Sequence, residues 1–470
     1  MNLIYNVKDK PKFGQCIVFA FQQLLAIMAA TIAVPAIVGN GMSASAALVG
    51  AGVGTIVYQL FTRFRSPVFL GSSFAFLGAM AAAFAGGVSM SLGFLGLIMG
   101  AFFAGLVYVV IAIIVKIAGV KWISKLMPAV VIGPTVAIIG LSLAGNAVGD
   151  MMKGDVLNAE GAAAASPFIA LLCALITLFV VILCSTYGGK RIRLIPFIIG
   201  ILAGYAVALV FTLIGNANNI DALKIIDFTP FKALAAEGKI GFSTFFSLPK
   251  FTFLEGFKGF KELNGAYVGT IAVAYIPVAF VVFAEHIADH KNLSTIIGKD
   301  LLEDPGLSRT LLGDGIGSFV GAIFGGCPNT TYGESIGCVA ITGNASVISI
   351  TYAAVLAVIV AFISPFVAFL DSIPACVMGG VCMTLYGFIA VSGLKMLQPV
   401  DLNENRNLFV ASVILIAGVG GLALNFNLKG GQVITVTSVA CALILGIVTN
   451  LMLAKKKEIP GHEEPQQLIK

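Results

Sequence analysis

Residues 325–337 read GGCPNTTYGESIG, a polar run between the apolar stretches SFVGAIF and VAITG. Proline, glycine and short polar side chains such as Asn329 and Thr331 disfavour a continuous helix, so main-chain N–H and C=O groups are left without helical partners. Such backbone is tolerated at membrane depth only where protein buries it or where it lines a polar cavity. The run therefore predicts the extended lead-in to a half-helix, set inside a membrane domain.

The rest of the chain supports the membrane part of this interpretation. Its 470 residues are 59% hydrophobic and 11% charged, and the mean hydropathy is +1.02. Ordinary soluble domains carry roughly 25% charged residues. Apolar runs such as 168–183 and 408–424 approach the ~20 residues that a helix needs to cross a hydrocarbon layer. They lack the alternation of apolar and polar residues that β-barrel strands show. We predict an all-α integral membrane protein whose first apolar run, near Cys16, is retained as a span.

Several classes of function are disfavoured by the composition. The eight cysteines stand singly in apolar runs with no CxxC pair, which indicates small hydrophobic side chains and no redox or metal site. A nucleophile and base pair at matching depth is also missing from the sequence, so an enzyme and a bound cofactor are not expected. The net charge of +6 gives no sign of nucleic-acid binding, because the basic residues lie mainly in the loops between the apolar segments.

Fourteen apolar segments are predicted to span the membrane, seven on each side of a polar, aromatic loop at 216–264. The first repeat is 1–215, the second is 265–453, and 454–470 is a tail. The predicted spans are 15–38, 46–62, 67–87, 92–115, 122–146, 167–187, 194–215, 265–289, 307–325, 329–343, 346–370, 374–394, 406–425 and 432–453.

The basic residues divide unevenly between the two predicted sides. With the N-terminus inside, 20 of the 28 Lys and Arg residues fall on the cytoplasmic side. Only Lys153 and Lys429 fall in short outer loops, and the six lysines of the long loop 216–264 count little toward orientation. Both termini are therefore predicted to be cytoplasmic.

An odd number of spans in each half predicts a seven-plus-seven inverted repeat, because the second half then starts on the opposite side. Transporters with such repeats bind substrate near the midplane, at interrupted spans in corresponding positions. The third span of each half opens with proline, a short polar group and an aromatic residue: SPVFLGSSFAFLGAM (66–80) and CPNTTYGESIGCVAI (327–341). We expect short extended segments in spans 3 and 10, with the N-termini of two half-helices directed at a central cavity.

Three carboxylates are predicted to lie within the membrane, whereas nearly all of the 22 acidic residues fall in loops or tails. They are Glu285, Asp289 and Glu334, and each costs about 2.5–3.5 kcal/mol at mid-span, which makes it a functional candidate. Glu285 and Asp289 are one turn apart on one helix face, and two acids there cannot both ionise cheaply, which suits proton carriage. His286 and His290 form a second pair on the adjacent face.

The same inventory suggests a ligand. Carboxylates accept hydrogen bonds from N–H groups, and free backbone N–H groups near Phe74 and Gly333 donate to carbonyl oxygens. A flat neutral molecule with alternating N–H and C=O groups fits, so pyrimidine and purine bases both qualify. No basic residue lies within 71–76 or 328–337, which argues against an anion but leaves purines open.

At these residues the sequence resembles the nucleobase:cation symporter-2, or nucleobase–ascorbate transporter, family and, within it, the bacterial uracil permeases. The resemblance rests on GSSFAF (71–76), AEH (284–286), KDLLEDPGLSR (299–309), PNTTYGES (328–335) and PACVMGGV (374–381), and it spans essentially the whole membrane region. It implies a core domain of spans 1–4 and 8–11, a gate domain of spans 5–7 and 12–14, and a homodimer.

The resemblance also implies roles for individual residues. The glutamate at position 334 resembles the residue found at this place in the pyrimidine branch of the family. Uracil permeases often carry a histidine four residues after the first glutamate; that place is Asp289 here, with His290 one step later, so either could relay the proton. The implied substrate-binding residues are Glu285, Glu334, Phe74, Gly333, Tyr332 and Ala30, and the implied proton-coupling residues are Glu285, Asp289 and His290.

These lines converge on a uracil:proton symporter of the cytoplasmic membrane that works by alternating access. Two alternatives stay open at this stage. One is a purine-base symporter of the xanthine or urate type on the same fold, and the other is an uncoupled nucleobase facilitator. The sequence also leaves the choice between proton and sodium open.

Overall fold

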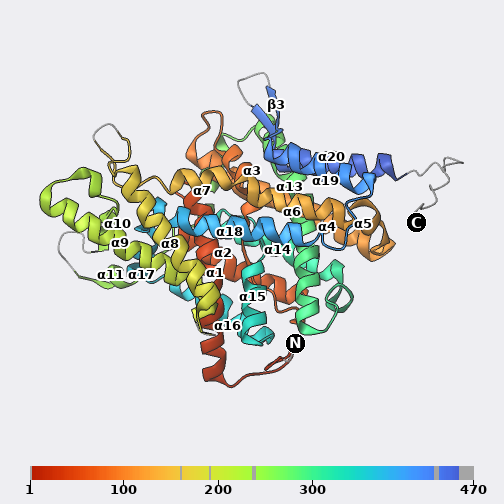
Figure 1. The fold of residues 1–470 in the computed structure, drawn as a ribbon, viewed down its shortest axis with the longest axis horizontal. Coiled ribbons are helices and arrows are strands. Elements are labelled where there is room, and N and C mark those ends of the chain that lie inside the picture. Colours follow the sequence, from red (N-terminus) through yellow and green to blue (C-terminus); the bar gives the residue numbers. More distant parts are fainter. Residues whose placement is uncertain (1–2, 159–160, 190–191, 235–239, 428–432, 455–470) are drawn as a thin grey trace, which may run out of the picture.

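The computed structural model describes residues 3–158, 161–189, 192–234, 240–427 and 433–454, and within them the fold is helical apart from two short two-stranded sheets (Figure 1). Eight helical segments of this part are long and apolar enough to cross a membrane. The chain is therefore a multi-pass helical membrane protein. The eight segments are α1 (Phe13–Val38), α2 (Ala44–Phe61), α4 (Met90–Ala118), α6 with α7 (Ala129–Ser142 and Ala144–Asp150), α8 (Pro167–Tyr187), α9 (Pro196–Asn218), α13 (Gly265–Ile297) and α18 (Ala375–Lys395).

Shorter elements complete the described part of the chain. The remaining α-helices are α3 (Leu77–Ala83), α5 (Lys121–Leu126), α10 (Thr229–Leu234), α11 (Phe242–Phe245), α12 (Thr252–Gly256), α14 (Leu307–Gly325), α15 (Gly333–Thr342), α16 (Val347–Val360), α17 (Ser364–Asp371), α19 (Asn405–Val419) and α20 (Ser438–Leu453). The strands and single-turn helices are β1 (Leu70–Ser72), β2 (Asn329–Thr331), β3 (Leu424–Asn427), β4 (Val433–Val436), η1 (Phe74–Phe76), η2 (Ile192–Leu194), η3 (Asp221–Leu223), η5 (Phe257–Lys261) and η6 (Leu302–Gly306).

Local sequence sets many of the helix ends. The side chains of Ser43, Ser89 and Asn264 accept hydrogen bonds from the first-turn N–H groups of α2, α4 and α13, at 3.2, 3.1 and 2.9 Å. These caps satisfy donors that a helix start leaves free. Gly298 and Gly343 end α13 and α15 with positive φ angles of 67° and 66°, a conformation that glycine adopts without steric cost.

The predicted extended segments are confirmed, and they lie side by side. Strands β1 and β2 pair antiparallel, with Leu70 opposite Thr331 and Ser72 opposite Asn329. Each strand leads into a helix, η1 with α3 after the first and α15 after the second. Two segments about 260 residues apart in the sequence thus meet in one short ribbon.

The predicted spans 406–425 and 432–453 are partly wrong. Helix α19 ends at Val419, and strands β3 and β4 form an antiparallel hairpin before α20 begins at Ser438. The sequence VITV of β4 is β-branched throughout, and such residues favour extended backbone over helix. Apolarity alone therefore misassigned a strand to a helical span. The predicted tail 454–470 lies, apart from Ala454, outside the described residues.

Helices α2 and α14 pack with their backbones nearly in contact. A Cβ atom at Gly50 would lie 2.4 Å from the carbonyl oxygen of Gly321, and one at Gly54 would lie 2.7 Å from that of Gly317. Small residues allow this approach, which is the usual way in which helices associate inside a membrane. The amide of Asn329 donates to the Gly50 carbonyl oxygen at 3.0 Å, so this crossing also holds strand β2.

An ionic cluster closes the turn before α14. Asp304 accepts from Lys299 Nζ at 2.5 Å and from Arg65 Nη1 at 2.9 Å. The hydrogen bonds from Lys299 and Arg65 lower the pKa of the Asp304 carboxyl to about 2. The cluster ties the segment that enters β1 to the turn between α13 and α14, although its side chains are about 40% exposed.

Candidate functional site

Side chains from α2 and from the residue that follows β2 hold the paired strands in place. The N–H of Leu70 donates to Thr55 Oγ1 at 2.9 Å, and that hydroxyl donates to the Leu70 carbonyl at 3.2 Å. The hydroxyl of Tyr332 donates across the ribbon to the Ser72 carbonyl at 2.7 Å. Tyr332 is only 3% exposed. The extended backbone is thus buried in protein, as membrane depth requires.

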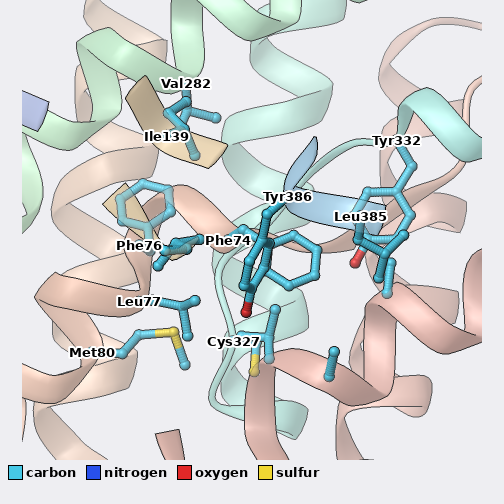
Figure 2. Close-up of a cluster of buried hydrophobic side chains, with 14 of the residues drawn as sticks. Phe74, Phe76, Leu77, Met80, Ile139, Val282, Cys327, Tyr332, Leu385 and Tyr386 are labelled. Carbon is cyan, nitrogen blue, oxygen red and sulfur yellow. The ribbon is translucent and has the colours of Figure 1, made fainter. Parts of the chain in front are cut away.

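Helix α15 begins at Gly333, directly after β2, and carries Glu334 in its first turn. The first N–H groups of a helix have no partner within it, and the helix dipole makes this end positive. Phe74 occupies the corresponding place after β1, at the start of η1. Its ring meets that of Tyr386 edge to face, with centroids 5.4 Å apart, at the centre of the apolar cluster in Figure 2.

A cavity of about 550 Å³ opens at this point. Its walls come from α13, from β2 and α15, and from helices α6, α8, α9 and α18, so it lies where the paired strands meet the opposite group of helices. Residues that line it are Ala26, Phe74, Val136, Ser185, Arg193, Pro196, Phe197, Glu285, Ala288, Asp289, Asn292, Thr330, Thr331, Tyr332, Gly333, Glu334, Gly337, Cys338, Ile341, Phe388, Ile389 and Ser392.

The three carboxylates singled out from the sequence all line this one cavity. Glu285 and Asp289 project from α13 and Glu334 from α15. Thr331 Oγ1 donates to Asp289 Oδ2 at 2.5 Å, which links α13 to strand β2. The cavity therefore combines several acceptors with the N-terminus of α15, a set that can hydrogen-bond both N–H and C=O groups of a small molecule.

His290 and Ala30 lie apart from the cavity wall. His290 is fully buried, its ring stacks on that of His286 with centroids 4.0 Å apart, and its Nε2 shares a hydrogen bond of 2.8 Å with the Tyr58 hydroxyl. Ala30 is also fully buried, and Ala26, one turn earlier on α1, lines the cavity in its place.

Asp314 is a buried carboxyl that the sequence analysis missed. Its Oδ2 bonds His286 Nδ1 at 2.7 Å, and the other ring nitrogen of His286 bonds Thr310 Oγ1 at 3.0 Å. All three side chains are fully buried. The assignment of nearly all other acids to loops is therefore wrong for Asp314, which stands alone within the predicted span 307–325 and could have been recognised by that position.

Gln23, from the first span, also reaches the site. Its amide donates to the hydroxyl of Ser335 in the first turn of α15, so α1 is tied to the helix that carries Glu334. No group of three or more His, Cys, Asp or Glu side chains in the described part of the chain is arranged to hold a metal ion.

A family model described as "Permease family" matches residues 14–426. The chain is 38% identical over 453 residues to the uracil permease of Bacillus caldolyticus, which covers 96% of this chain and 94% of that protein. The chain belongs to the nucleobase:cation symporter-2 family.

Other relatives in this family agree over the same length. Identity to the uracil permease of Bacillus subtilis (strain 168) is 38%, covering 99% of this chain and 98% of the relative. For the uracil permease of Escherichia coli (strain K12) it is 35%, covering 95% of each. The chain is therefore a transporter, not an enzyme.

Solved structures share the fold at low sequence identity. The transmembrane domain of a cyanobacterium bicarbonate transporter, BicA, superimposes with a TM-score of 0.60 and 13% identity, covering 94% of this chain and 99% of that one. The murine anion transporter Slc26a9 in its inward-facing state gives a TM-score of 0.60 with 12% identity, covering 95% of this chain and 69% of that one. This likeness extends to the fold alone.

Proposed function

We propose that this permease imports uracil together with a proton by alternating access. Uracil as the substrate is supported by relatives named uracil permeases that match nearly the whole chain. The observation that carries the proposal is the meeting of Glu285, Glu334 and the N-terminus of α15 on one cavity wall. This set complements the alternating N–H and C=O edge of a pyrimidine.

In this proposal Glu285 and Glu334 accept the N–H groups of the base. The backbone N–H groups of Phe74 and Gly333 donate to its carbonyl oxygens, aided by the positive end of α15. Tyr332 holds the strand ribbon in place through its bond to Ser72. Ala30 is fully buried and does not line the cavity, so in this proposal it packs behind the wall and does not touch the base.

We assign proton carriage to Glu285 and Asp289. Both line the cavity within one turn of α13, whereas His290 is buried behind them and bonded to Tyr58. Two carboxyls so close together in a poorly solvated site favour the sharing of a proton. Asp289 is thus preferred over His290 as the partner of Glu285.

Transport in this proposal uses fourteen spans arranged as two inverted seven-span repeats, with both termini in the cytoplasm and the protein in the cytoplasmic membrane as a homodimer. Residues 1–215 and 265–453 form the repeats around loop 216–264. The core domain, spans 1–4 and 8–11, carries the carboxylates; the gate domain, spans 5–7 and 12–14, supplies the facing wall through residues such as Val136 and Phe388. Movement of the core against the gate would expose the cavity to each side in turn.

The test is uptake of radiolabelled uracil into proteoliposomes containing the purified protein. An inward proton gradient is compared with no gradient and with an inward sodium gradient of equal size. We expect accumulation only with the proton gradient, abolished by a protonophore. Excess xanthine should leave it unchanged, whereas excess unlabelled uracil should compete. Equal uptake without a gradient would establish a facilitator, and competition by xanthine alone would establish a purine carrier.

A further inference from the structure

The cavity has two chemically different ends. At one end are the partly buried carboxyls of Glu285, Asp289 and Glu334. At the other end the lining side chains of Arg193, Asn292 and Ser392 are exposed to solvent. A single cavity thus offers hydrogen-bond acceptors at one end and a guanidinium group at the other.

The distance between these ends exceeds the length of one base. Along α13 the wall runs from Glu285 to Asn292, seven residues or about 10 Å at 1.5 Å per residue, and along α15 from Gly333 to Ile341, about 12 Å. The volume of about 550 Å³ equals that of roughly 18 water molecules at ~30 Å³ each. A pyrimidine bound at the carboxylates leaves most of this space unfilled.

Arg193 is placed to meet an anion at the solvent-exposed end of the cavity. It lies in η2, which packs against α15, and its Nη2 donates to the Thr186 carbonyl near the end of α8 at 2.7 Å. Within the described residues Arg193 forms no ion pair. The adjoining sequence also carries Lys190 and Arg191, which lie outside the described residues. A guanidinium group with open donors prefers phosphate oxygens, which it can bind in bidentate fashion.

We propose that this cavity also binds a pyrimidine nucleoside 5′-monophosphate: the one ring N–H left on its base, N3–H, donates to Glu285 or Glu334, the ribose takes the place of the other N–H, and the phosphate meets Arg193. This inference rests on the proposed function, which supplies the base-binding end and places Arg193 on the cytoplasmic side. Such a nucleotide is what a phosphoribosyl transfer would make from the imported base. It would occupy the substrate site from inside and slow further uptake.

The nucleotide acts as an inhibitor rather than a cargo because of the charges along the cavity. Among the described residues that line the cavity, Arg193 is the only basic one, whereas the carboxyls of Glu285, Asp289 and Glu334 all line it. Carrying a phosphate past them would bring like charges together in a poorly solvated site, which is unfavourable. The phosphate therefore stays at the mouth and holds the protein in one conformation.

The experiment is displacement of radiolabelled uracil from the purified full-length protein in detergent. Competitors are uridine 5′-monophosphate, uridine, and inorganic phosphate. Three variants are compared with the parent: Arg193→Gln, Arg193→Lys, and Lys116→Gln, an exposed charge predicted to face the same side but absent from the cavity wall. The uracil Kd of each variant serves as the control for folding.

We expect the monophosphate to bind the parent at least about tenfold more tightly than uridine, as one charge-assisted contact would give. Arg193→Gln should remove this preference, Arg193→Lys should weaken it because an ammonium group cannot bind phosphate in bidentate fashion, and Lys116→Gln should retain it. The inference is overturned if the monophosphate binds no better than uridine, which is the result expected if Arg193 binds a lipid headgroup instead. It is also overturned if inorganic phosphate displaces uracil equally well, or if Arg193→Gln and Lys116→Gln behave alike. Failure of uracil itself to bind the parent would instead refute the proposed function.

Discussion

Replacing Gly50 by alanine should test whether the α2–α14 crossing supports the site. The added Cβ would lie 2.4 Å from the carbonyl oxygen of Gly321 and 3.3 Å from the N–H nitrogen of Gly325, and both are backbone atoms that cannot rotate away. Ordinary contact begins near 3.4 Å, so the two helices must separate by about 1 Å. Overpacking of this kind costs about 1–3 kcal/mol. The Gly50 carbonyl would also shift relative to Asn329, which holds strand β2.

The assay is thermal unfolding of the purified protein, together with its uracil Kd. The matched control is Gly269→Ala, within α13, where a Cβ meets no atom within 4 Å and alanine is the better helix former. We expect Gly50→Ala to lower the melting temperature by about 1–3 °C and to weaken uracil binding, while the control lowers neither. Equal melting temperatures for the two variants would refute the argument that this close crossing determines the position of the strands.

Three further substitutions give distinct outcomes. Tyr332→Phe removes the hydrogen bond to the Ser72 carbonyl and should cost about 0.5–1.5 kcal/mol of stability in thermal unfolding. Tyr275→Phe is its control: the hydroxyl it removes has no hydrogen-bond partner among the described residues, so this change should cost nothing. Asp304→Asn removes both ion pairs of that cluster. The folded-state pKa of Asp304 is lowered to about 2, so the stabilisation is present above the unfolded pKa near 4 and is lost as the pH falls toward 2. The melting temperatures of the parent and the variant should therefore converge on acidification. A constant difference between them would contradict this. Asp314→Ala leaves Nδ1 of the buried His286 without its hydrogen-bond partner and should lower the melting temperature more than Asp314→Asn does. Equal effects would show that the hydrogen bond is unimportant.

Much of the site was predictable because it depends on local pattern. Proline, glycine and short polar residues marked the two extended segments, and the four-residue spacing of Glu285 and Asp289 placed both on one face of α13. The cost of a carboxylate in a membrane then identified these residues as functional candidates without any knowledge of the fold. The start of α15 beside Glu334 follows from the same local reasoning.

The remaining features depend on contacts between distant segments. The pairing of β1 with β2, the bond between His286 and Asp314, and the approach of Arg193 to the cavity all join different elements. No spacing rule along the chain predicts which element lies opposite another. The β3–β4 hairpin was missed for a different reason, since an apolar run satisfies the requirement for burial either as a strand or as a helix.

The most direct test of the account is the equilibrium binding of uracil to the purified protein and to Glu285→Gln. Glu303→Gln is the matched control, because Glu303 is exposed and lies in η6, away from the cavity wall. The account predicts that Glu285→Gln weakens uracil binding by at least about tenfold, the loss of one hydrogen bond to a charged group, while Glu303→Gln binds as the parent does. Unchanged uracil affinity in a folded Glu285→Gln protein would contradict the assignment of this cavity as the uracil site.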